Sequence, residues 1–299
     1  MLLAVAVLAA TPLAIGPPAH AEQHGAAQGE GSGPAGLPPV PFALTPDARA
    51  EAFADSVRLY GRQARAGETR AQYLFGYLYE NGLGVEQDFG TAAEWYTKAA
   101  ASGSRDAQFR LGSLVLNGQG VARDLPRAAE LFRAAAAQGL GAAQLNLAIM
   151  LESGAAGPGA DPAAAARWYR AAALQGNAEA QNNLGLLYVT GQGLTRDVDE
   201  GLRWLQLAAR QGSADGLLNL ARMNADGIGV DRDLVKAYAL LLRVQPDASP
   251  AETAALAARV REAMAVSLTA AQLAEAERLA ADPGLLTGAP ATPVADDKS

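Results

Sequence analysis

Small and apolar residues recur along the middle of the chain with the period of an α-helix. Ala71, Phe75 and Tyr79 fall at positions i, i+4 and i+8, and the same offsets recur in the stretch that opens at Ala180. Residues with this spacing lie on one face of a helix. Each stretch therefore predicts a helix with one buried face.

The helical pattern itself repeats five times at a nearly constant interval of 36, 36, 37 and 36 residues. The five passages open at Ala71, Ala107, Ala143, Ala180 and Gly216. A fixed period of this length is typical of stacked arrays, in which one unit cannot bury its apolar face alone. We predict repeats over 71–106, 107–142, 143–179, 180–215 and 216–246.

Within each repeat the pattern predicts a first helix (helix A), a glycine loop, a second helix (helix B) and a short turn. A glycine after a helix accepts the left-handed conformation that closes it, and the apolar residue after the loop can pack back onto the core. Helix B carries Trp95, Trp168 and Trp204 at one shared repeat position. Because this position faces inward in the predicted array, we interpret the tryptophans as core residues rather than stacking platforms for sugars or bases.

One aspartate recurs just before each helix B and admits two interpretations. The five residues are Asp88, Asp124, Asp161, Asp197 and Asp233. A row of carboxylates could bind metal, but helix layers lie roughly 10 Å apart, too far for neighbouring repeats to share an ion. An aspartate at a helix start accepts hydrogen bonds from unpaired backbone N–H groups. We expect helix caps and no metal site.

The repeat unit resembles the Sel-one-like repeat family, a relative of the tetratricopeptide repeats with a slightly longer unit. The fourth repeat carries the pattern most fully, with Leu184-Gly185, Tyr188, Gly191, Gly193, Asp197, Trp204, Ala208-Ala209 and Gly212. The resemblance implies an all-α, right-handed α-solenoid. The third repeat departs from the pattern because its loop, residues 154–161, is one residue longer. The fifth opens on Gly216 and has Asn224 in place of the tyrosine.

Different compositions flank the array on its N-terminal side. Residues 1–21 combine an uncharged apolar run with Ala19-His20-Ala21, a small-x-small pattern typical of signal peptides, and we expect cleavage after Ala21. An uncleaved membrane anchor is the alternative. Residues 22–45 are rich in glycine, proline and alanine and predict a flexible tether. Residues 46–70 predict an N-terminal capping helix that resembles the second half of a repeat.

The C-terminal side predicts a cap over residues 247–282, followed by a disordered tail over 283–299. The motifs at Ser249 and Thr269 each resemble a capping box, with Glu252 and Gln272 three residues on. They predict helices over 250–266 and 270–281. Such a cap covers the apolar side that the last repeat of an array leaves open.

Composition excludes several kinds of chemistry. The chain has no cysteine, and its two histidines, His20 and His24, both precede the array. Thiolate nucleophiles, disulfides, histidine bases and histidine metal ligands are therefore absent from the repeats. The net charge of −7 argues against nucleic-acid binding, which needs a basic surface. We expect no enzymatic activity and no cofactor.

The resemblance also implies where a partner would bind. In the family, helix A lines the concave side of the superhelix. The residues at the ligand-facing positions of helix A form a stripe of apolar and polar side chains, which is suited to binding an extended peptide or a helix. The implied partner-binding residues are Tyr73, Tyr77, Glu80, Phe109, Ser113, Asn117, Leu145, Ile149, Glu152, Asn182, Leu186, Leu218 and Arg222. The alternative is that Leu145, Ile149 and Leu186 pack against neighbouring helices. Gln72, Gln108, Gln144 and Gln181 flank the stripe at one repeat position.

These features predict a non-enzymatic adaptor or regulator that binds a protein or peptide in the cell envelope. The arginine-rich, lysine-poor composition is typical of bacteria with GC-rich genomes, so the periplasm is the expected location. Two other classes stay open: an envelope structural protein that binds peptidoglycan or polysaccharide, and a cell-wall hydrolase. Contact with a membrane is expected only through the uncleaved precursor or a membrane-protein partner.

Overall fold

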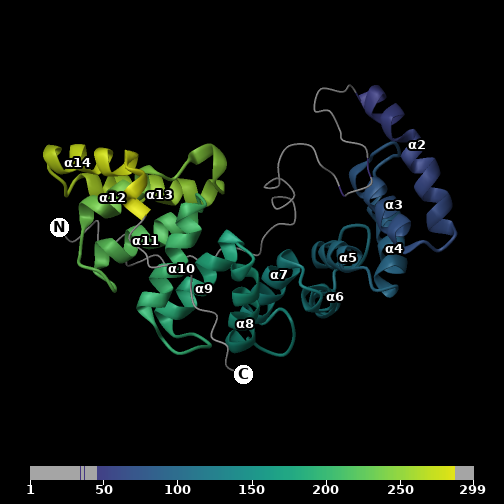
Figure 1. Ribbon diagram of the computed structural model, residues 1–299, viewed down its shortest axis with the longest axis horizontal. Coiled ribbons are helices and arrows are strands. Elements are labelled where there is room, and N and C mark those ends of the chain that lie inside the picture. Colours follow the sequence, from purple (N-terminus) through teal and green to yellow (C-terminus); the bar gives the residue numbers. More distant parts are fainter. Residues whose placement is uncertain (1–33, 35–36, 38–45, 287–299) are drawn as a thin grey trace. The chain divides into compact units, whose positions relative to one another are not determined.

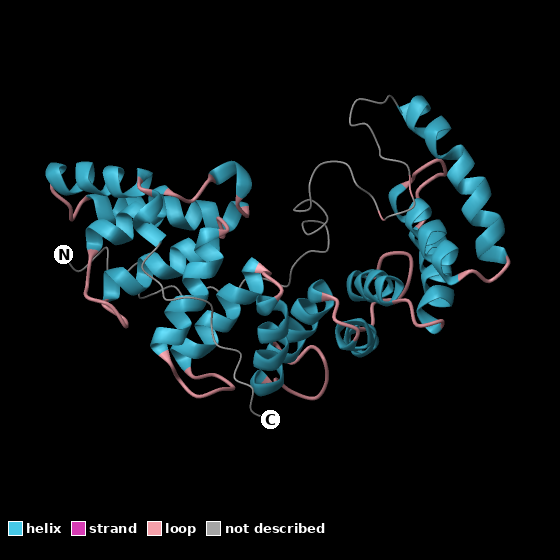
Figure 2. Cartoon of the chain, viewed as in Figure 1, coloured by secondary structure: helices cyan, strands magenta, loops and turns pink. Residues whose placement is uncertain are grey.

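The computed structural model describes residue 34, residue 37 and residues 46–286, and every regular element within them is a helix (Figures 1 and 2). The α-helices are α2 (Pro46–Arg65), α3 (Thr69–Asn81), α4 (Phe89–Ala101), α5 (Arg105–Asn117), α6 (Leu125–Ala137), α7 (Gly141–Glu152), α8 (Pro162–Leu174), α9 (Ala178–Thr190), α10 (Val198–Arg210), α11 (Ala214–Asp226), α12 (Leu234–Leu242), α13 (Ala251–Ala265) and α14 (Ala270–Ala281). Two short 3₁₀ helices, η1 (Pro246–Ala248) and η2 (Pro283–Leu286), complete the described chain. The all-α class predicted from the sequence is confirmed.

The helices form antiparallel pairs that follow the predicted repeats. Helix A packs on helix B in the pairs α3 with α4, α5 with α6, α9 with α10 and α11 with α12, and each helix B packs on the next helix A within its unit. The chain divides after Asp161 into an N-terminal and a C-terminal unit. The division falls in the long loop of the third repeat, so α7 belongs to the first unit and α8 to the second.

The start of helix B is capped as predicted in four of the repeats. The side chains of Asp88, Asp124, Asp197 and Asp233 each accept a hydrogen bond from a backbone N–H in the first turn of the following helix. Each of these aspartates also donates its own N–H to a carbonyl near the end of helix A, as from Asp88 to Tyr79 at 3.0 Å. The recurrent aspartates thus join the two helices of a repeat.

The core position of helix B lies one residue beyond the tryptophans. Trp204 is buried, as predicted, whereas Trp95 and Trp168 are half-buried, and Trp95 packs against the hydrophobic cluster of the N-terminal unit. The side chains at the next repeat position, namely Tyr96, Phe132, Tyr169 and Leu205, are all 0% exposed. One residue along a helix turns the side chain by about 100°, so the residue after the tryptophan position points in a different direction.

A glycine in helix A makes room for the deep side chain of helix B. A Cβ at Gly76 would lie 2.9 Å from the ring of Tyr96, and one at Gly112 would lie equally close to the ring of Phe132. Real Cβ atoms do not approach other atoms so closely. The Leu-Gly pair of the repeat motif therefore reflects close helix packing.

A glutamine near the start of helix A joins each of the first four repeats to the helix before it. Gln72, Gln108, Gln144 and Gln181 each donate their Nε2 to the carbonyl eight residues earlier, at 3.1–3.4 Å. In two repeats the glutamine Oε1 also accepts from a second glutamine at the end of helix B, as from Gln138 to Gln108 at 2.9 Å and from Gln211 to Gln181 at 2.7 Å. These glutamines have a structural role.

Replacing Ser102 by glutamine should stabilise the N-terminal unit by about 1 kcal/mol. Ser102 occupies the repeat position of Gln138, but it is too short to reach Gln72, whose buried Oε1 has no hydrogen-bond partner in the described structure. A glutamine there would supply the missing donor. Urea unfolding of the Ser102→Gln variant tests this, with Ser102→Ala as the control that adds no donor. A gain of equal size in both variants would contradict the explanation.

The C-terminal cap differs from the sequence prediction at both of its ends. The capping box at Thr269 forms, but the one at Ser249 does not, because Pro250 occupies the cap position and α13 begins at Ala251. Residues Pro283–Leu286 were predicted to belong to the disordered tail, yet they form η2. Leu286 is 6% exposed, and its carbonyl accepts a hydrogen bond from Arg210 Nε at 2.8 Å. Burial of a leucine against α10 orders this segment.

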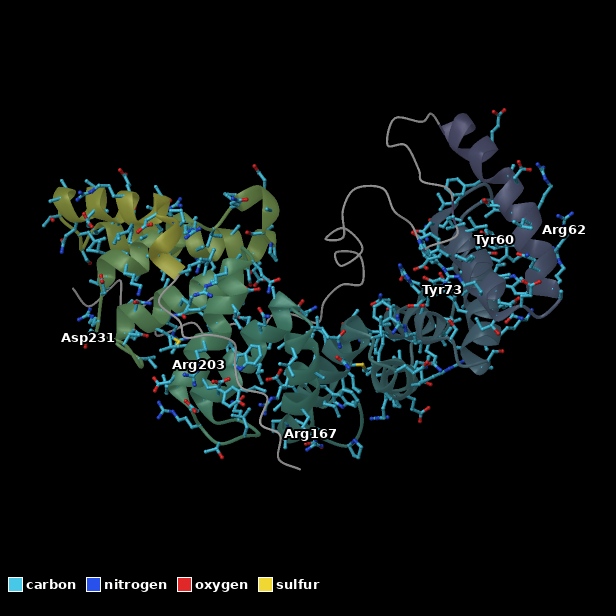
Figure 3. All side chains as sticks on the ribbon, in the orientation of Figure 1. Tyr60, Arg62, Tyr73, Arg167, Arg203 and Asp231 are labelled. Carbon is cyan, nitrogen blue, oxygen red and sulfur yellow. The ribbon has the colours of Figure 1, made fainter. Side chains whose placement is uncertain are left out.

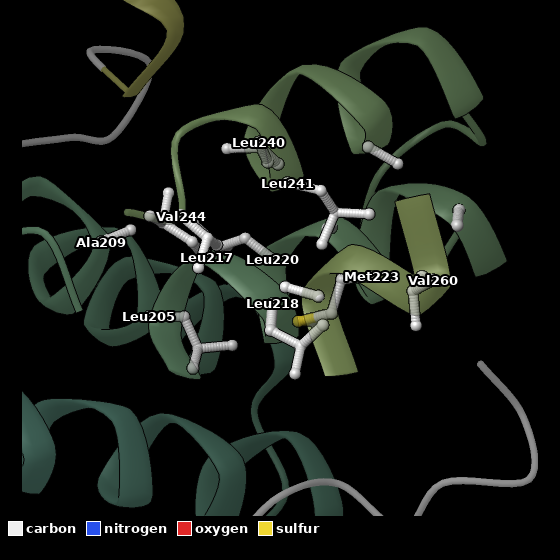
Figure 4. Packing of buried hydrophobic residues seen from close by; sticks show 14 of the residues in the cluster. Leu205, Ala209, Leu217, Leu218, Leu220, Met223, Leu240, Leu241, Val244 and Val260 are labelled. Carbon is white, nitrogen blue, oxygen red and sulfur yellow. The ribbon is translucent and has the colours of Figure 1, made fainter. Parts of the chain in front are cut away.

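The core of the C-terminal unit extends through these capping helices. Buried leucine, alanine, valine and methionine side chains of α9 to α12 form one cluster with Val260 and Met264 of α13 and with Leu286 (Figure 4). Helix α14 packs on α12. The cap is thus part of the hydrophobic core that it closes.

Residues 1–33, on which the signal peptide and most of the tether were predicted, lie outside the described structure. Within the described residues, no helix has both the length and the apolar character needed to cross a bilayer.

Candidate functional site: an aromatic and charged cluster on helices α3, α4 and α5

Three of the predicted partner-binding residues share one face of α3. Tyr73, Tyr77 and Glu80 are separated by four and three residues, so successive turns of the helix place them in a row. Figure 3 labels Tyr73 in the N-terminal unit. The structure brings these residues together with Tyr96 of α4 and Arg110 of α5.

Glu80 lies at the centre of the polar contacts. Its Oε1 is 3.4 Å from Arg110 Nη1, and its Oε2 accepts a hydrogen bond of 2.5 Å from the Tyr96 hydroxyl. The side chains of Glu80 and Arg110 are 14% and 29% exposed. Thus Glu80 links helix A of the first repeat to its own helix B and to helix A of the second repeat.

The aromatic rings surround this ion pair. Arg110 Cζ lies 5.3 Å from the centroid of the Tyr77 ring, within the range of a cation–π interaction. The rings of Tyr73 and Tyr96 are tilted against one another with centroids 5.9 Å apart. Most of Tyr73 and all of Tyr96 are buried, whereas Tyr77 is half-buried.

Electrostatics keep the tyrosines protonated and the arginine charged. Burial raises the pKa of Tyr96 well above its ordinary value, and the Glu80 carboxylate raises it further. Burial also raises the pKa of Tyr73 and of Tyr77, although Arg110 opposes the shift. Burial lowers the pKa of Arg110, but Glu80 together with Tyr96, Tyr73 and Tyr77 outweighs that effect and leaves the pKa above its ordinary value. The hydroxyls are therefore donors at neutral pH.

This arrangement is suited to binding. Its carboxylate, Glu80, is paired with the Arg110 guanidinium and the Tyr96 hydroxyl. No three His, Asp or Glu side chains come together as a metal site in residues 34, 37 and 46–286. Tyrosine and arginine are the residue types that contribute most at protein–protein interfaces. Tyr77, Phe109 and Arg110 are partly exposed, as is the Glu80 side chain to a smaller extent.

The remaining predicted residues of the N-terminal unit lie at different depths. Phe109 is half-buried, with its ring 5.8 Å from that of Phe132, and Ser113 is buried with its hydroxyl donating to the Phe109 carbonyl. Asn117 is exposed and Glu152 is half-buried. Leu145 and Ile149 are 1% and 6% exposed. Their burial agrees with the alternative that these two residues pack against neighbouring helices.

In the C-terminal unit the predicted residues are mostly interior. Leu186 and Leu218 belong to the buried core. Asn182 is 1% exposed and accepts a hydrogen bond of 2.8 Å from Asn219, a residue of α11. Arg222 is partly exposed and lies 3.6 Å from Asp226. We therefore centre the candidate site on the cluster of the N-terminal unit.

Sequence reasoning missed Arg110 and Tyr96. Arg110 directly follows the predicted Phe109, at a helix A position where the other repeats have Leu74, Asn146, Asn183 and Asn219. The sequence did contain a signal for Arg110, because this position is uncharged in every other repeat. Tyr96 carried no such signal, since two other repeats also have an aromatic residue there.

Comparison with known proteins identifies the repeat. A family model described as Sel1 repeat matches residues 69–104, 105–140, 141–177, 178–213 and 214–243. Together these ranges cover more than half of the chain. The chain belongs to the Sel1 repeat family. Its repeats begin two residues before the positions that we predicted, at the start of helix A.

Solved structures of other Sel1 repeat proteins are similar to this one. A Sel1 repeat protein from Oxalobacter formigenes is 28% identical, with a TM-score of 0.58 over 66% of this chain and 77% of that one. A protective antigen of uropathogenic Escherichia coli, described as having the SLR fold, is 27% identical, with a TM-score of 0.52 over 76% of this chain and 55% of that one. A search of curated proteins finds no match.

Membership of the family supports the α-solenoid class that we predicted from the sequence. Sel1 repeats generally mediate protein–protein interactions as scaffolds, and proteins built from them are typically non-catalytic. The cluster on α3, α4 and α5 has the composition that such a role requires.

Proposed function

We propose that this Sel1 repeat protein is an exported adaptor or regulator, which binds a segment of an envelope protein at Tyr77, Phe109 and Arg110. The observation that supports this is the partly exposed aromatic and guanidinium surface, held in place from behind by Glu80 and Tyr96. A preorganised surface loses little side-chain entropy when a partner binds.

The periplasm is our proposed location, and it rests on the sequence of residues 1–21. Cell fractionation followed by mass spectrometry of the intact protein tests it. We expect a periplasmic chain that begins at Glu22. A membrane-bound chain that retains Met1 would contradict export with cleavage.

Binding to polysaccharide is less well supported. An exposed tryptophan face is the usual platform for a sugar ring, but Lys98 Nζ lies 3.8 Å from the centre of the Trp95 ring and Phe75 packs edge-on against that ring at 5.2 Å.

Site-directed photo-crosslinking in living cells tests the binding surface. A photoreactive phenylalanine at position 77 should crosslink an envelope protein, and the same residue in place of Leu59 should not. Leu59 is a suitable control because it is an exposed apolar residue of the same unit, on α2.

Purified components then test the contribution of the individual side chains. We expect Tyr77→Ala together with Phe109→Ala to weaken binding of the crosslinked partner at least 10-fold, while Leu59→Ala leaves binding unchanged. Circular dichroism of each variant checks that the helices remain folded. Unchanged affinity of a folded Tyr77→Ala/Phe109→Ala variant would rule out this surface.

A further inference from the structure

A second aromatic cluster lies at the N-terminal end of the array, between α2, α3 and α4. Its buried members are Phe53, Ala64, Ala71, Phe75 and Leu78. Around them lie partly buried hydrophobic residues, namely Val57, Tyr60, Tyr79, Leu83, Val85 and Trp95. Figure 3 labels Tyr60 on α2. We call this set the N-terminal aromatic cluster; it shares no residue with the candidate site.

Contacts between rings hold the cluster together. Phe75 packs edge-on against Tyr79 and against Trp95, with ring centroids 5.1 and 5.2 Å away. Arg65 and Lys98 place cationic groups over Phe75 and Trp95. Rings fixed in this way form a surface that needs no rearrangement to accept an apolar side chain.

The position of α2 explains why these residues are only partly buried. In the full repeats a helix B packs on a helix A of its own repeat, as α4 does on α3. Helix α2 resembles a helix B, and in the described chain no helix A precedes it. Within the described residues, α2 therefore has no helix A of its own on which to pack.

Leu37 of the tether packs against this cluster. Its backbone N–H donates to the carbonyl of Pro34 at 3.1 Å. In the sequence Leu37 is followed by Pro38 and Pro39. Prolines restrict the unbound chain, so a proline-rich segment loses less conformational entropy on docking than a glycine-rich one.

We propose that the N-terminal aromatic cluster is a docking site for the chain's own tether, which binds in cis through Leu37. The tether then supplies the apolar contact that a preceding helix A would make. Docking of Leu37 fixes the point at which the tether contacts the array. This inference does not depend on the proposed partner site.

Tryptophan fluorescence of the full chain gives the first test. Replacing Leu37 by aspartate should expose Trp95 to water and shift the emission to longer wavelength, and the shift should vanish when Trp95→Phe is also present. Leu59→Asp is the matched control, because it introduces the same charge at an exposed leucine of the same unit. An emission spectrum that Leu37→Asp leaves unchanged would overturn the proposal.

Competition by a peptide gives the second test. A synthetic peptide of residues 33–42 should bind the Leu37→Asp chain at least 10-fold more tightly than the wild-type chain. The reason is that the attached tether occupies the wild-type site at an effective concentration of roughly millimolar. Equal affinity for the two chains, including absence of binding to both, would mean that the cluster is not a docking site for this segment.

Discussion

Replacing Gly120 by alanine should destabilise the N-terminal unit by about 3–4 kcal/mol. Gly120 is the second glycine of the loop that follows α5, and its φ of 66° lies in the left-handed region. A Cβ at this position would be 2.3 Å from the backbone N of Gly90 and from the backbone C of Phe89. The loop packs directly on the first turn of α4, so the backbone itself would have to move.

Gly139 provides the control for this prediction. It also belongs to the N-terminal unit and has a φ of 82°, but no atom lies within 4 Å of the position that its Cβ would occupy. We expect Gly139→Ala to cost only about 1 kcal/mol, the strain of a left-handed alanine. Urea unfolding of both variants measures the difference. Equal losses would show that loop packing on α4 contributes little.

Replacing Arg110 by alanine should destabilise the same unit by about 2–3 kcal/mol. The substitution removes the cation from a side chain that is 14% exposed, and leaves the Glu80 carboxylate with the Tyr96 hydroxyl as its partner in the described structure. Native-state hydrogen exchange at amides of α3 and α5 measures the effect locally. A local measurement is needed because repeat arrays do not always unfold in a single step.

The double variant Glu80→Gln/Arg110→Met separates two contributions to the loss of stability: the unpaired buried charge and the lost side-chain packing. It retains most of the side-chain volume and leaves neither charge buried alone. We expect it to be more stable than Arg110→Ala, because a lone buried charge costs more than the absence of the pair. If the double variant is the less stable of the two, the ion pair itself stabilises the unit. That result would contradict our account.

The same two variants relate the cluster to the proposed function. Both remove the guanidinium from the surface at Tyr77, so both should weaken binding of the partner, whatever their order of stability. Partner affinity that follows stability alone would indicate that Arg110 only positions α3 against α5. Affinity lost equally in both variants would indicate direct contact.

Some of the architecture was predictable because it depends on local chemistry. Asp88 and its equivalents cap helix B because a carboxylate beside unpaired N–H groups is favourable wherever a helix starts. The helix boundaries follow from the period of apolar residues together with the glycines that end each helix. The motif at Ser249 failed for an equally local reason, since Pro250 took the cap position instead.

Other features depend on which residues of neighbouring helices a side chain contacts. The period of the sequence does not specify these contacts. The tryptophans share a repeat position, but only Trp204 is fully buried, and the residue after each one is 0% exposed. Gln72 and its equivalents, which sequence reasoning placed beside the partner stripe, instead bind the preceding helix. Leu286 packs into the core, although its surroundings in the sequence predict a disordered tail.

By itself, therefore, the sequence determined the all-α repeat architecture, the number of repeats and the absence of histidine and cysteine chemistry from them. These properties are set by composition and by contacts within one repeat. Only the tertiary structure decided that Glu80 contacts Arg110, 30 residues away, and that Leu37 packs against the N-terminal aromatic cluster. Such pairings depend on how far one helix is turned and shifted against the next, which follows from side-chain packing across repeats and not from the period.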